Sequence, residues 1–194
     1  MYINPGLLEL HEQNPDCVGW IHIEGTKIDY PVMYHPEEKN YYLRRNFHKE
    51  YDISGTPYIA EICDLEDFDN LILYGHHMNS GAMFAHLDKY KSESFYQEHK
   101  TFTYSTLHGD ETYEVMACFA VPVYTGNDFA YYAFTKAETH FEYETFVETC
   151  RKKSYYDTGV TADYGDQLIT LSTCEYSHKN GRMVVVGRLL REDD

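Results

Sequence analysis

The chain has few basic residues, and this shortage excludes two classes of partner. It contains 16 Lys and Arg against 32 Asp and Glu, so its net charge is −16 at pH 7. The acidic residues run through the whole chain, and no basic stripe is available to contact phosphates. An anionic membrane surface would repel such a domain as well. We therefore predict that this domain binds no nucleic acid and does not itself contact a membrane.

Long apolar runs and paired cysteine motifs are also missing. No segment reaches the roughly 18 apolar residues of a membrane span, and no signal peptide is visible. The five cysteines are odd in number and form no C-x-x-C, so neither a disulfide framework nor a zinc site is indicated. Cys63 and Cys118 fall in apolar runs and Cys150 in a helical stretch, which is typical of buried, unreactive thiols. We predict no metal and no cofactor.

The sequence does contain enough apolar material for a folded domain. Hydrophobic residues make up 43% of the chain and aromatic residues 16%, and 20 residues are tyrosine. A length of 194 residues suits one domain, and no linker divides it. We predict a single domain over residues 1–194, with an N-terminal helical segment over residues 1–16 that Pro15 brings to an end.

Hydrophobic periodicity predicts many short strands and few helices. Strands are expected at residues 18–23, 28–33, 58–63, 70–76, 101–106, 112–123, 168–174 and 183–186. Short helices are expected at residues 83–89 and 93–100, and a long one at residues 137–153. The apolar face of the long helix is expected to carry Phe141, Phe146, Val147 and Cys150, with Tyr143 off that face. This set of elements predicts a mostly β fold, namely a largely antiparallel barrel with helical insertions.

Three reactive side chains stand at the edges of predicted strands. The run LITLSTC ends at Cys174, Arg182 precedes the run MVVV, and the run LILY leads through Gly75 to His76. A tight loop joins the strands of Cys174 and Arg182, which puts both residues on the same rim. A thiolate attacks carbonyl groups, an imidazole moves protons and a guanidinium can hold a developing oxyanion. Together these groups indicate thiol-based acyl transfer.

Each of these residues also has a simpler interpretation. His76 could cap a turn, and Arg182 could be a surface charge beside a strand. Ser172 shares a strand face with Cys174 and could either line a site or fill a polar core position. His77 points away from the face of His76, so one metal ion would not meet both, and we expect its replacement to be tolerated. A non-enzymatic binding barrel with tyrosine-rich rims is a further alternative.

The order of these motifs resembles that of sortases. The segment TLSTC at residues 170–174 with downstream Arg182 is similar to the T-L-x-T-C…R signature of that family, and NLILYGH at residues 70–76 resembles the strand that delivers its histidine. Other features resemble class B sortases in particular: VGWI at residues 18–21, NYYL at residues 40–43, Met78, Gly81, Met83, Phe84 and the long helix before the Cys174 strand. The similarity covers nearly the whole chain from about residue 14.

This resemblance implies an eight-stranded sortase barrel and a cysteine transpeptidase at the extracellular face of a Gram-positive cell membrane. Cys174 is then the nucleophile, His76 the acid/base, and Arg182 the oxyanion or substrate-positioning cation. The candidate substrate-binding residues are Ser172, Thr173, Glu175 and Tyr74. The family's N-terminal membrane anchor is expected to be missing from these 194 residues.

The resemblance also implies the substrates. A surface protein with a C-terminal sorting motif would be cleaved after Thr through a thioacyl intermediate, and a peptidoglycan amine would then accept the protein. The motif could be Asn-Pro-x-Thr-Asn-like or Ser/Pro-Pro-x-Thr-Gly-like. If water takes the place of the amine, the same three groups make a cysteine hydrolase, and a product assay with and without an added amine separates the two.

Overall fold

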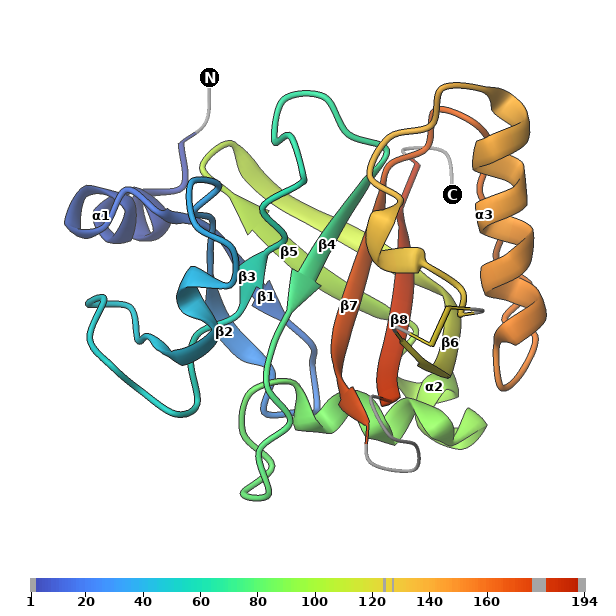
Figure 1. Cartoon of the computed structure of the whole chain (residues 1–194), viewed down its shortest axis with the longest axis horizontal. Helices are drawn as coiled ribbons and strands as arrows, with labels where there is room; N and C mark the ends of the chain where they lie inside the picture. The colour runs from blue at the N-terminus through green and yellow to red at the C-terminus, as the bar shows by residue number, and fades with distance from the viewer. Residues whose placement is uncertain (1–2, 124, 127, 176–180, 192–194) are drawn as a thin grey trace.

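The computed structural model describes residues 3–123, 125–126, 128–175 and 181–191. In this part of the chain, eight strands close into a barrel (Figure 1). The side chains of Cys174 and Glu175 lie outside this description. The strands are β1 (Cys17–His22), β2 (Asp29–Met33), β3 (Tyr58–Ile59), β4 (Asn70–Tyr74), β5 (Thr101–Thr106), β6 (Gly109–Pro122), β7 (Leu168–Glu175) and β8 (Gly181–Leu189). The predicted mostly β barrel is thus confirmed.

The order of the strands around the barrel is β1-β2-β3-β4-β7-β8-β6-β5. β2 pairs with β3 and β4 with β7 in parallel, and the other pairs among the described strands are antiparallel. The barrel is therefore mostly antiparallel, as predicted, and its parallel pair β4–β7 aligns two strands that lie far apart in the sequence.

Six helical segments surround the barrel in the described part of the chain. They are α1 (Pro5–Gln13), η1 (Tyr41–Arg44), η2 (Phe84–Lys91), α2 (Glu93–Glu98), η3 (Tyr131–Ala133) and α3 (His140–Lys153), where η marks a 3₁₀ helix. The side chain of Asn4 caps α1 and that of Thr139 caps α3, each accepting a backbone N–H at 3.2 Å. Among the described residues, no helix is long and apolar enough to cross a membrane.

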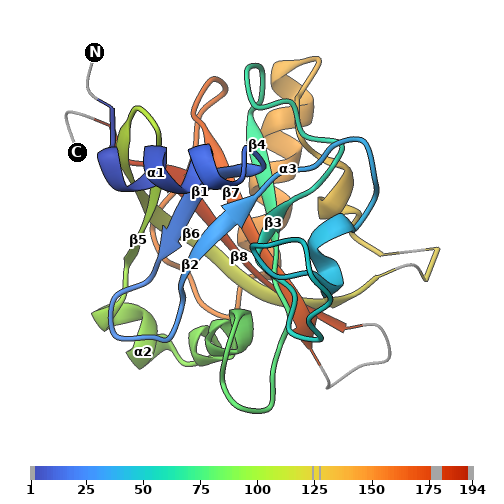
Figure 2. The ribbon, with the colours of Figure 1, turned by 90° about the vertical axis from the view of Figure 1, so that its left-hand side faces the viewer.

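The helices cover different parts of the barrel. Figure 1 shows α3 along one side of the barrel and α2 with η2 across its lower end, and Figure 2 shows α1 lying over β1. α3 packs against β6 and changes the pattern of burial along that strand. The start of β6 alternates between buried and more exposed residues, whereas Val115 through Phe119 are all buried, because the barrel interior takes one face of β6 there and α3 the other.

The buried face of α3 differs from the predicted one. Tyr143, Phe146, Val147 and Cys150 are buried, and they follow the helical spacing of three, four and seven residues. Phe141 is 75% exposed, so its predicted place on the apolar face is wrong, as is the exclusion of Tyr143. The helix starts at His140, and Phe141 in its first turn points to solvent, whereas the Tyr143 hydroxyl donates to the Asp166 carbonyl at 2.7 Å.

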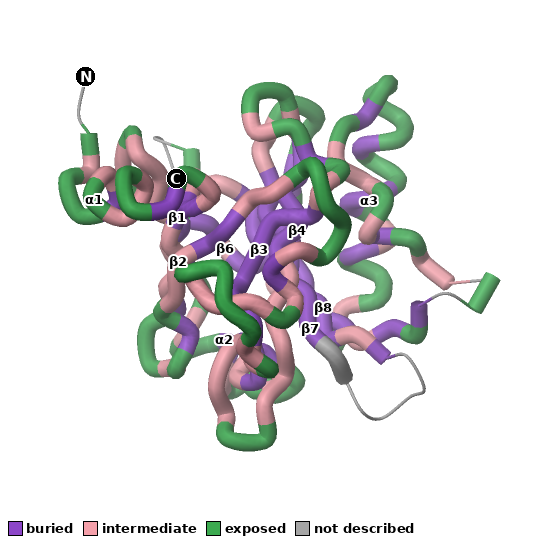
Figure 3. The backbone as a smooth tube through the Cα atoms, turned by 60° about the vertical axis from the view of Figure 1, so that its left-hand side comes forward, coloured by how far each residue is buried: buried purple, intermediate pink, exposed green. Residues whose placement is uncertain are grey.

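Apolar side chains form three clusters. The first fills the barrel and includes Ile72, Leu87 and Val185. The second lies between the barrel wall and α3, where Phe146 stacks on Phe134 with ring centroids 4.0 Å apart. The third is smaller and packs under α1. In Figure 3 the buried tube follows the strands, and the exposed parts include connecting loops and much of α1 and α3.

Two strands are shorter than the sequence predicts. β3 holds only Tyr58 and Ile59, because the chain turns back where the Cys63 N–H donates to the Ala60 carbonyl at 3.0 Å. β4 stops at Tyr74, two residues before His76. At the next position the ring of Phe84 lies so close that a Cβ on Gly75 would come within 2.5 Å of it. Gly75 therefore allows η2 to approach the end of β4.

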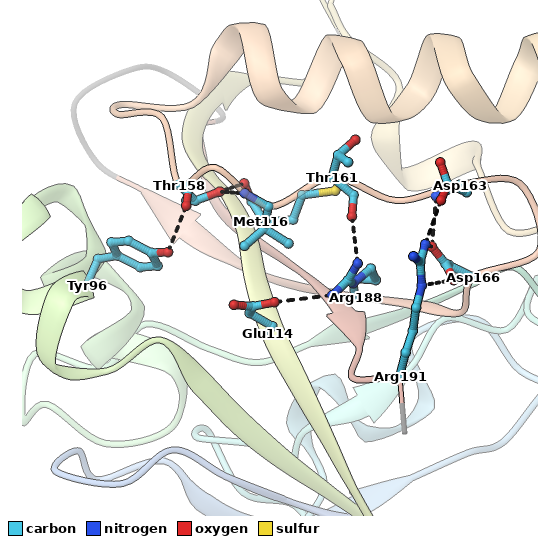
Figure 4. A network of polar contacts seen from close by, with 10 residues as sticks. Tyr96, Glu114, Met116, Thr158, Thr161, Asp163, Asp166, Arg188 and Arg191 are labelled. Carbon is cyan, nitrogen blue, oxygen red and sulfur yellow. Dashed lines mark hydrogen bonds and ion pairs between the residues drawn. The ribbon is translucent and has the colours of Figure 1, made fainter. Parts of the chain in front are cut away.

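Polar side chains tie the segment before β7 to the end of β8 (Figure 4). Arg188 reaches Glu114 and the Thr161 carbonyl, each at 3.3 Å. Arg191 forms hydrogen bonds of 2.6 and 3.1 Å with Asp166 and one of 2.7 Å with Asp163. Burial alone would raise the pKa of Asp166, but the hydrogen bonds from Arg191 and from the Asp163 N–H outweigh it, so this pKa lies below its usual value.

Candidate active site

Three neighbouring strands bring His76, Cys174 and Arg182 to one rim of the barrel. β4 runs parallel to β7 with Tyr74 opposite Ser172, and the Gly75 N–H donates to the Ser172 carbonyl at 3.2 Å. His76 and Cys174 each stand two residues further along the chain. Cys174 is the direct partner of Arg182 in the antiparallel pair β7–β8. The shared rim predicted for Cys174 and Arg182 is therefore confirmed.

A cavity of about 460 Å³ opens at this rim. Its walls come from the β4 end, β7, β8, η1 and the segments near β3 and η3. The lining residues are Lys39, Asn40, Leu43, Tyr58, Ala60, Glu61, Ile62, Tyr74, Gly75, His76, Tyr132, Ala133, Ser172, Thr173 and Arg182. A cavity of this size lies within the range of ligand-binding sites, and both polar and apolar side chains line it.

The half-buried ring of His76 is oriented by a backbone carbonyl. Its Nε2 lies 2.7 Å from the carbonyl oxygen of Leu43. A carbonyl oxygen only accepts hydrogen bonds, so Nε2 must carry the proton and donate. Nδ1 is then the nitrogen left to take up and release a proton at the site.

Arg182 lines the cavity, and within the described part of the chain its guanidinium makes one hydrogen bond. One terminal nitrogen donates to the carbonyl of the preceding Gly181 at 2.9 Å. Among the side chains that the structure describes, no carboxylate forms an ion pair with Arg182. A guanidinium carries five N–H donors, so this contact leaves others for a carbonyl or an oxyanion in the cavity.

The four other cysteines lie in the interior of the protein. Cys17, Cys63, Cys118 and Cys150 are all buried and free, as the sequence predicts for the last three. Burial raises the pKa of Cys17 and Cys63 to about 11 and that of Cys118 to about 12, and it raises the pKa of Cys150 as well. These thiols remain protonated at neutral pH and have no access to a substrate. Cys174 is left as the candidate nucleophile.

Three of the candidate substrate-binding residues line the cavity, namely Tyr74, Ser172 and Thr173. Ser172 is fully buried, and its hydroxyl lies 2.7 Å from that of Tyr131. Ser172 therefore both fills a polar core position and lines the cavity. The Thr173 hydroxyl is buried and has no hydrogen-bond partner among the described residues. The side chain of Glu175, the fourth candidate, lies outside the described residues.

Much of the opposite wall was not predicted from the sequence. Lys39, Asn40 and Glu61 bring polar groups to it, with the Lys39 amine 3.9 Å from the Glu61 carboxylate. Tyr132 and Ala133 enter from η3. Lys39 and Asn40 precede η1 in an irregular segment, Glu61 follows the shortened β3, and η3 is too short to show helical periodicity. The sequence signal nearest to them is NYYL at residues 40–43, which marked a family feature and not a site.

Comparison with known proteins assigns this geometry to a family. A family model for the Sortase domain matches residues 21–190. The chain belongs to the sortase family. Sortase B of Listeria monocytogenes is 37% identical over 187 residues, which span 95% of this chain and 74% of that protein. Sortase B of Staphylococcus aureus is 30% identical over 193 residues, which span 98% of this chain and 77% of that protein.

Solved sortase B structures share the fold along nearly the whole chain. A Staphylococcus aureus sortase B–substrate complex superimposes with a TM-score of 0.88 at 30% identity, covering 98% of this chain and 87% of that one. Sortase B from Bacillus anthracis in complex with AAEK1 gives a TM-score of 0.85 at 33% identity, covering 98% and 86%. Sortase B from Clostridium perfringens gives 0.88 at 30%, covering 95% and 99%. The protein is thus a sortase B-type enzyme.

Proposed function

We propose that the protein is a cysteine transpeptidase that cleaves a C-terminal sorting signal after Thr and transfers the surface protein to a peptidoglycan amine. The observation that supports this most directly is the strand register. It aligns Cys174 with Arg182 and leads His76 to the same rim, beside a cavity of about 460 Å³. The whole chain is one catalytic domain in this proposal, and it acts at the extracellular face of the membrane.

In the first half-reaction, the Cys174 thiolate attacks the carbonyl carbon of the substrate Thr. A C–S bond forms, and the tetrahedral adduct collapses with loss of the C–N bond. His76 gives its Nδ1 proton to the departing amine, because Nε2 is committed to the Leu43 carbonyl. The enzyme is left with a thioester on Cys174 and a neutral His76.

Arg182 stabilises the negative charge that builds on the carbonyl oxygen during this attack. Its remaining N–H donors can meet the oxyanion or hold a neighbouring substrate carbonyl. Arg182 stands near the start of β8 opposite Cys174 in the strand register, and its hydrogen bond to the Gly181 carbonyl restricts the guanidinium, so we expect little reorganisation when charge develops. Tyr74, Ser172, Thr173 and Glu175 are the residues that we propose contact the rest of the motif.

In the second half-reaction, an amine replaces the first leaving group. His76 takes a proton from the incoming amine at Nδ1, the amine nitrogen attacks the thioester, and the C–S bond breaks as a new amide forms. The thiolate of Cys174 and the imidazolium are restored together. Because a sortase B has been solved in complex with triglycine, this peptide is a suitable probe for the acceptor position.

A peptide panel tests this function. Asn-Pro-x-Thr-Asn-like and Ser/Pro-Pro-x-Thr-Gly-like peptides are incubated with the enzyme with and without triglycine, and the products are identified by mass. We expect cleavage after Thr and, with triglycine, a product in which triglycine is joined to Thr. Cleavage that yields only the free acid at all triglycine concentrations would assign the protein to the cysteine hydrolases. Cleavage of none of the peptides would contradict the proposed substrate class.

A further inference from the structure

The loop that carries His76 is held on its other side by a second histidine. We propose that His77 and Asp88 act as a positioning pair, which fixes the backbone that presents the His76 imidazole to the cavity. This inference rests on the role proposed for His76. From the sequence alone, replacement of His77 is expected to be tolerated. The contact between His77 and Asp88 changes that expectation.

The pair is a short contact between partly buried groups. His77 Nε2 lies 2.9 Å from Asp88 Oδ2, and the two side chains are 16% and 34% exposed. A carboxylate accepts hydrogen bonds, so Nε2–H of His77 donates to it. The second carboxylate oxygen of Asp88 lies 3.4 Å from the amine of Lys91. Asp88 thus contacts the partly buried His77 through one carboxylate oxygen and the more exposed Lys91 through the other.

Asp88 sits on an element that is fixed to the barrel. It belongs to η2, whose residues Phe84, Leu87 and Tyr90 are fully buried and which packs against β7 and β8. Phe84 also packs directly over Gly75 at the end of β4. A tether from Asp88 to His77 therefore links the His76 loop to the same two strands that carry Cys174 and Arg182.

The loop between β4 and η2 is closed by further contacts. The Phe84 N–H donates to the His76 carbonyl at 2.8 Å, and His77 pairs with Met83 in an isolated β-bridge. Met83 has a φ of 55°, which costs energy for a residue with a side chain, and its N–H donates to the Tyr30 hydroxyl at 3.0 Å. The loop therefore holds one conformation against local strain, and the His77–Asp88 contact is one of the side-chain contacts that keep it there.

The orientation of His76 depends on this backbone. Within the described structure, the His76 ring makes one hydrogen bond, to the Leu43 carbonyl on the other side of the cavity. That bond fixes the ring only if the main chain at His76 keeps its distance from Leu43. A shift of the loop by about 1 Å would lengthen the bond, and a misplacement of that size can cost up to about 100-fold in rate.

The test compares deletion and conservative variants at both positions. His77→Ala and Asp88→Ala remove the contact, whereas His77→Gln keeps an N–H donor and Asp88→Asn keeps an acceptor. We expect kcat per active site to fall about 10-fold in both alanine variants with KM unchanged, and to recover largely in Gln and Asn. The double alanine variant should be no slower than either single one, because both remove the same contact.

Active sites are counted by titrating Cys174 with a small alkylating agent, and the melting temperature is recorded for each variant. His22→Ala is the matched control, since His22 of β1 contacts Asp29 of β2 at 3.2 Å in an exposed pair and its replacement should leave kcat unchanged. A lower melting temperature with unchanged kcat per active site would reduce the pair to a structural contact and overturn the proposal. So would wild-type kcat in His77→Ala.

His76→Ala and Cys174→Ala are measured alongside and report on the proposed function separately. Turnover that survives in either of them would contradict that function. An unchanged kcat in His77→Ala while these two are inactive would overturn only the positioning pair.

Discussion

Cys174 is the last residue but one of β7, at the rim of a cavity, whereas the other four cysteines lie inside the packing of the barrel and its helices. We expect Cys174→Ala to abolish peptide cleavage and to leave the free energy of unfolding nearly unchanged. Cys118→Ala is the matched comparison, since Cys118 is fully buried on β6. It should keep cleavage and lose about 1–2 kcal/mol of stability. Peptide cleavage and urea denaturation measure both effects, and cleavage by Cys174→Ala would exclude it as the nucleophile.

Arg182 gives a second test at the residue scale, because lysine keeps its charge and loses its planar set of donors. We expect Arg182→Lys to lower kcat/KM by at least about 100-fold, the usual scale for removing one oxyanion donor. Arg182→Ala should be slower still, with alkylation of Cys174 by a small electrophile largely preserved. Near-normal turnover in Arg182→Lys would mean that charge alone suffices. Normal turnover in Arg182→Ala would make Arg182 a flanking surface charge.

At the scale of elements, α3 stabilises the barrel through one face only. Phe146→Ala removes a buried ring that stacks on Phe134 and should cost about 3–5 kcal/mol. Phe141→Ala, on the same helix, removes a ring that is 75% exposed and should change the stability by about 0.5 kcal/mol or less. Urea unfolding of the two variants separates them. Equal losses would mean that the sequence-derived face, which includes Phe141, is the packed one in solution.

The elements that the sequence predicts well are those whose pattern is set locally. Alternation locates β1, because one of its faces is less buried than the other, and a continuous apolar run locates β7, because both of its faces are buried. The prediction fails where tertiary contacts decide. The strand at residues 58–63 is cut to Tyr58–Ile59 by a turn, and the face of α3 depends on where Thr139 starts the helix.

The site divides in the same way. His76, Cys174 and Arg182 could be predicted because each follows or precedes an apolar run, and register brings such strand ends together. The place of Lys39 and Glu61 at the cavity could not, since Lys39 stands in an irregular segment, Glu61 falls where the predicted strand breaks off, and the two meet only in the folded barrel. The His77–Asp88 contact was missed for the same reason, because Asp88 reaches the loop only after η2 has packed against the barrel.

At the scale of the whole molecule, the network that joins β8 to the segment before β7 makes stability depend on pH (Figure 4). The pKa of Asp166 is lower in the folded chain than its usual value, so its ionised form stabilises the fold. This contribution is fully present above the unfolded-state pKa of about 4 and is lost as the pH falls through the folded-state pKa.

We therefore expect Asp166→Asn to be less stable than the wild type by about 1 kcal/mol at pH 7, with the difference shrinking below about pH 4. Urea unfolding at pH 7, 5, 4 and 3 measures it. Asp163→Asn is the matched control, because Asp163 contacts the same Arg191 but is 77% exposed, and its loss should be smaller. A difference that is as large at pH 3 as at pH 7 would contradict this assignment.

The central claim is that acyl transfer passes through a thioester on Cys174, and mass spectrometry of the intact enzyme tests it most directly. The enzyme is mixed with a sorting-signal peptide, quenched in acid and digested. We predict a mass increase equal to the peptide portion that ends at Thr, located on the fragment that contains Cys174 and discharged by triglycine as a Thr–triglycine product. Peptide cleavage without any adduct, or an adduct located on another cysteine, would contradict the account.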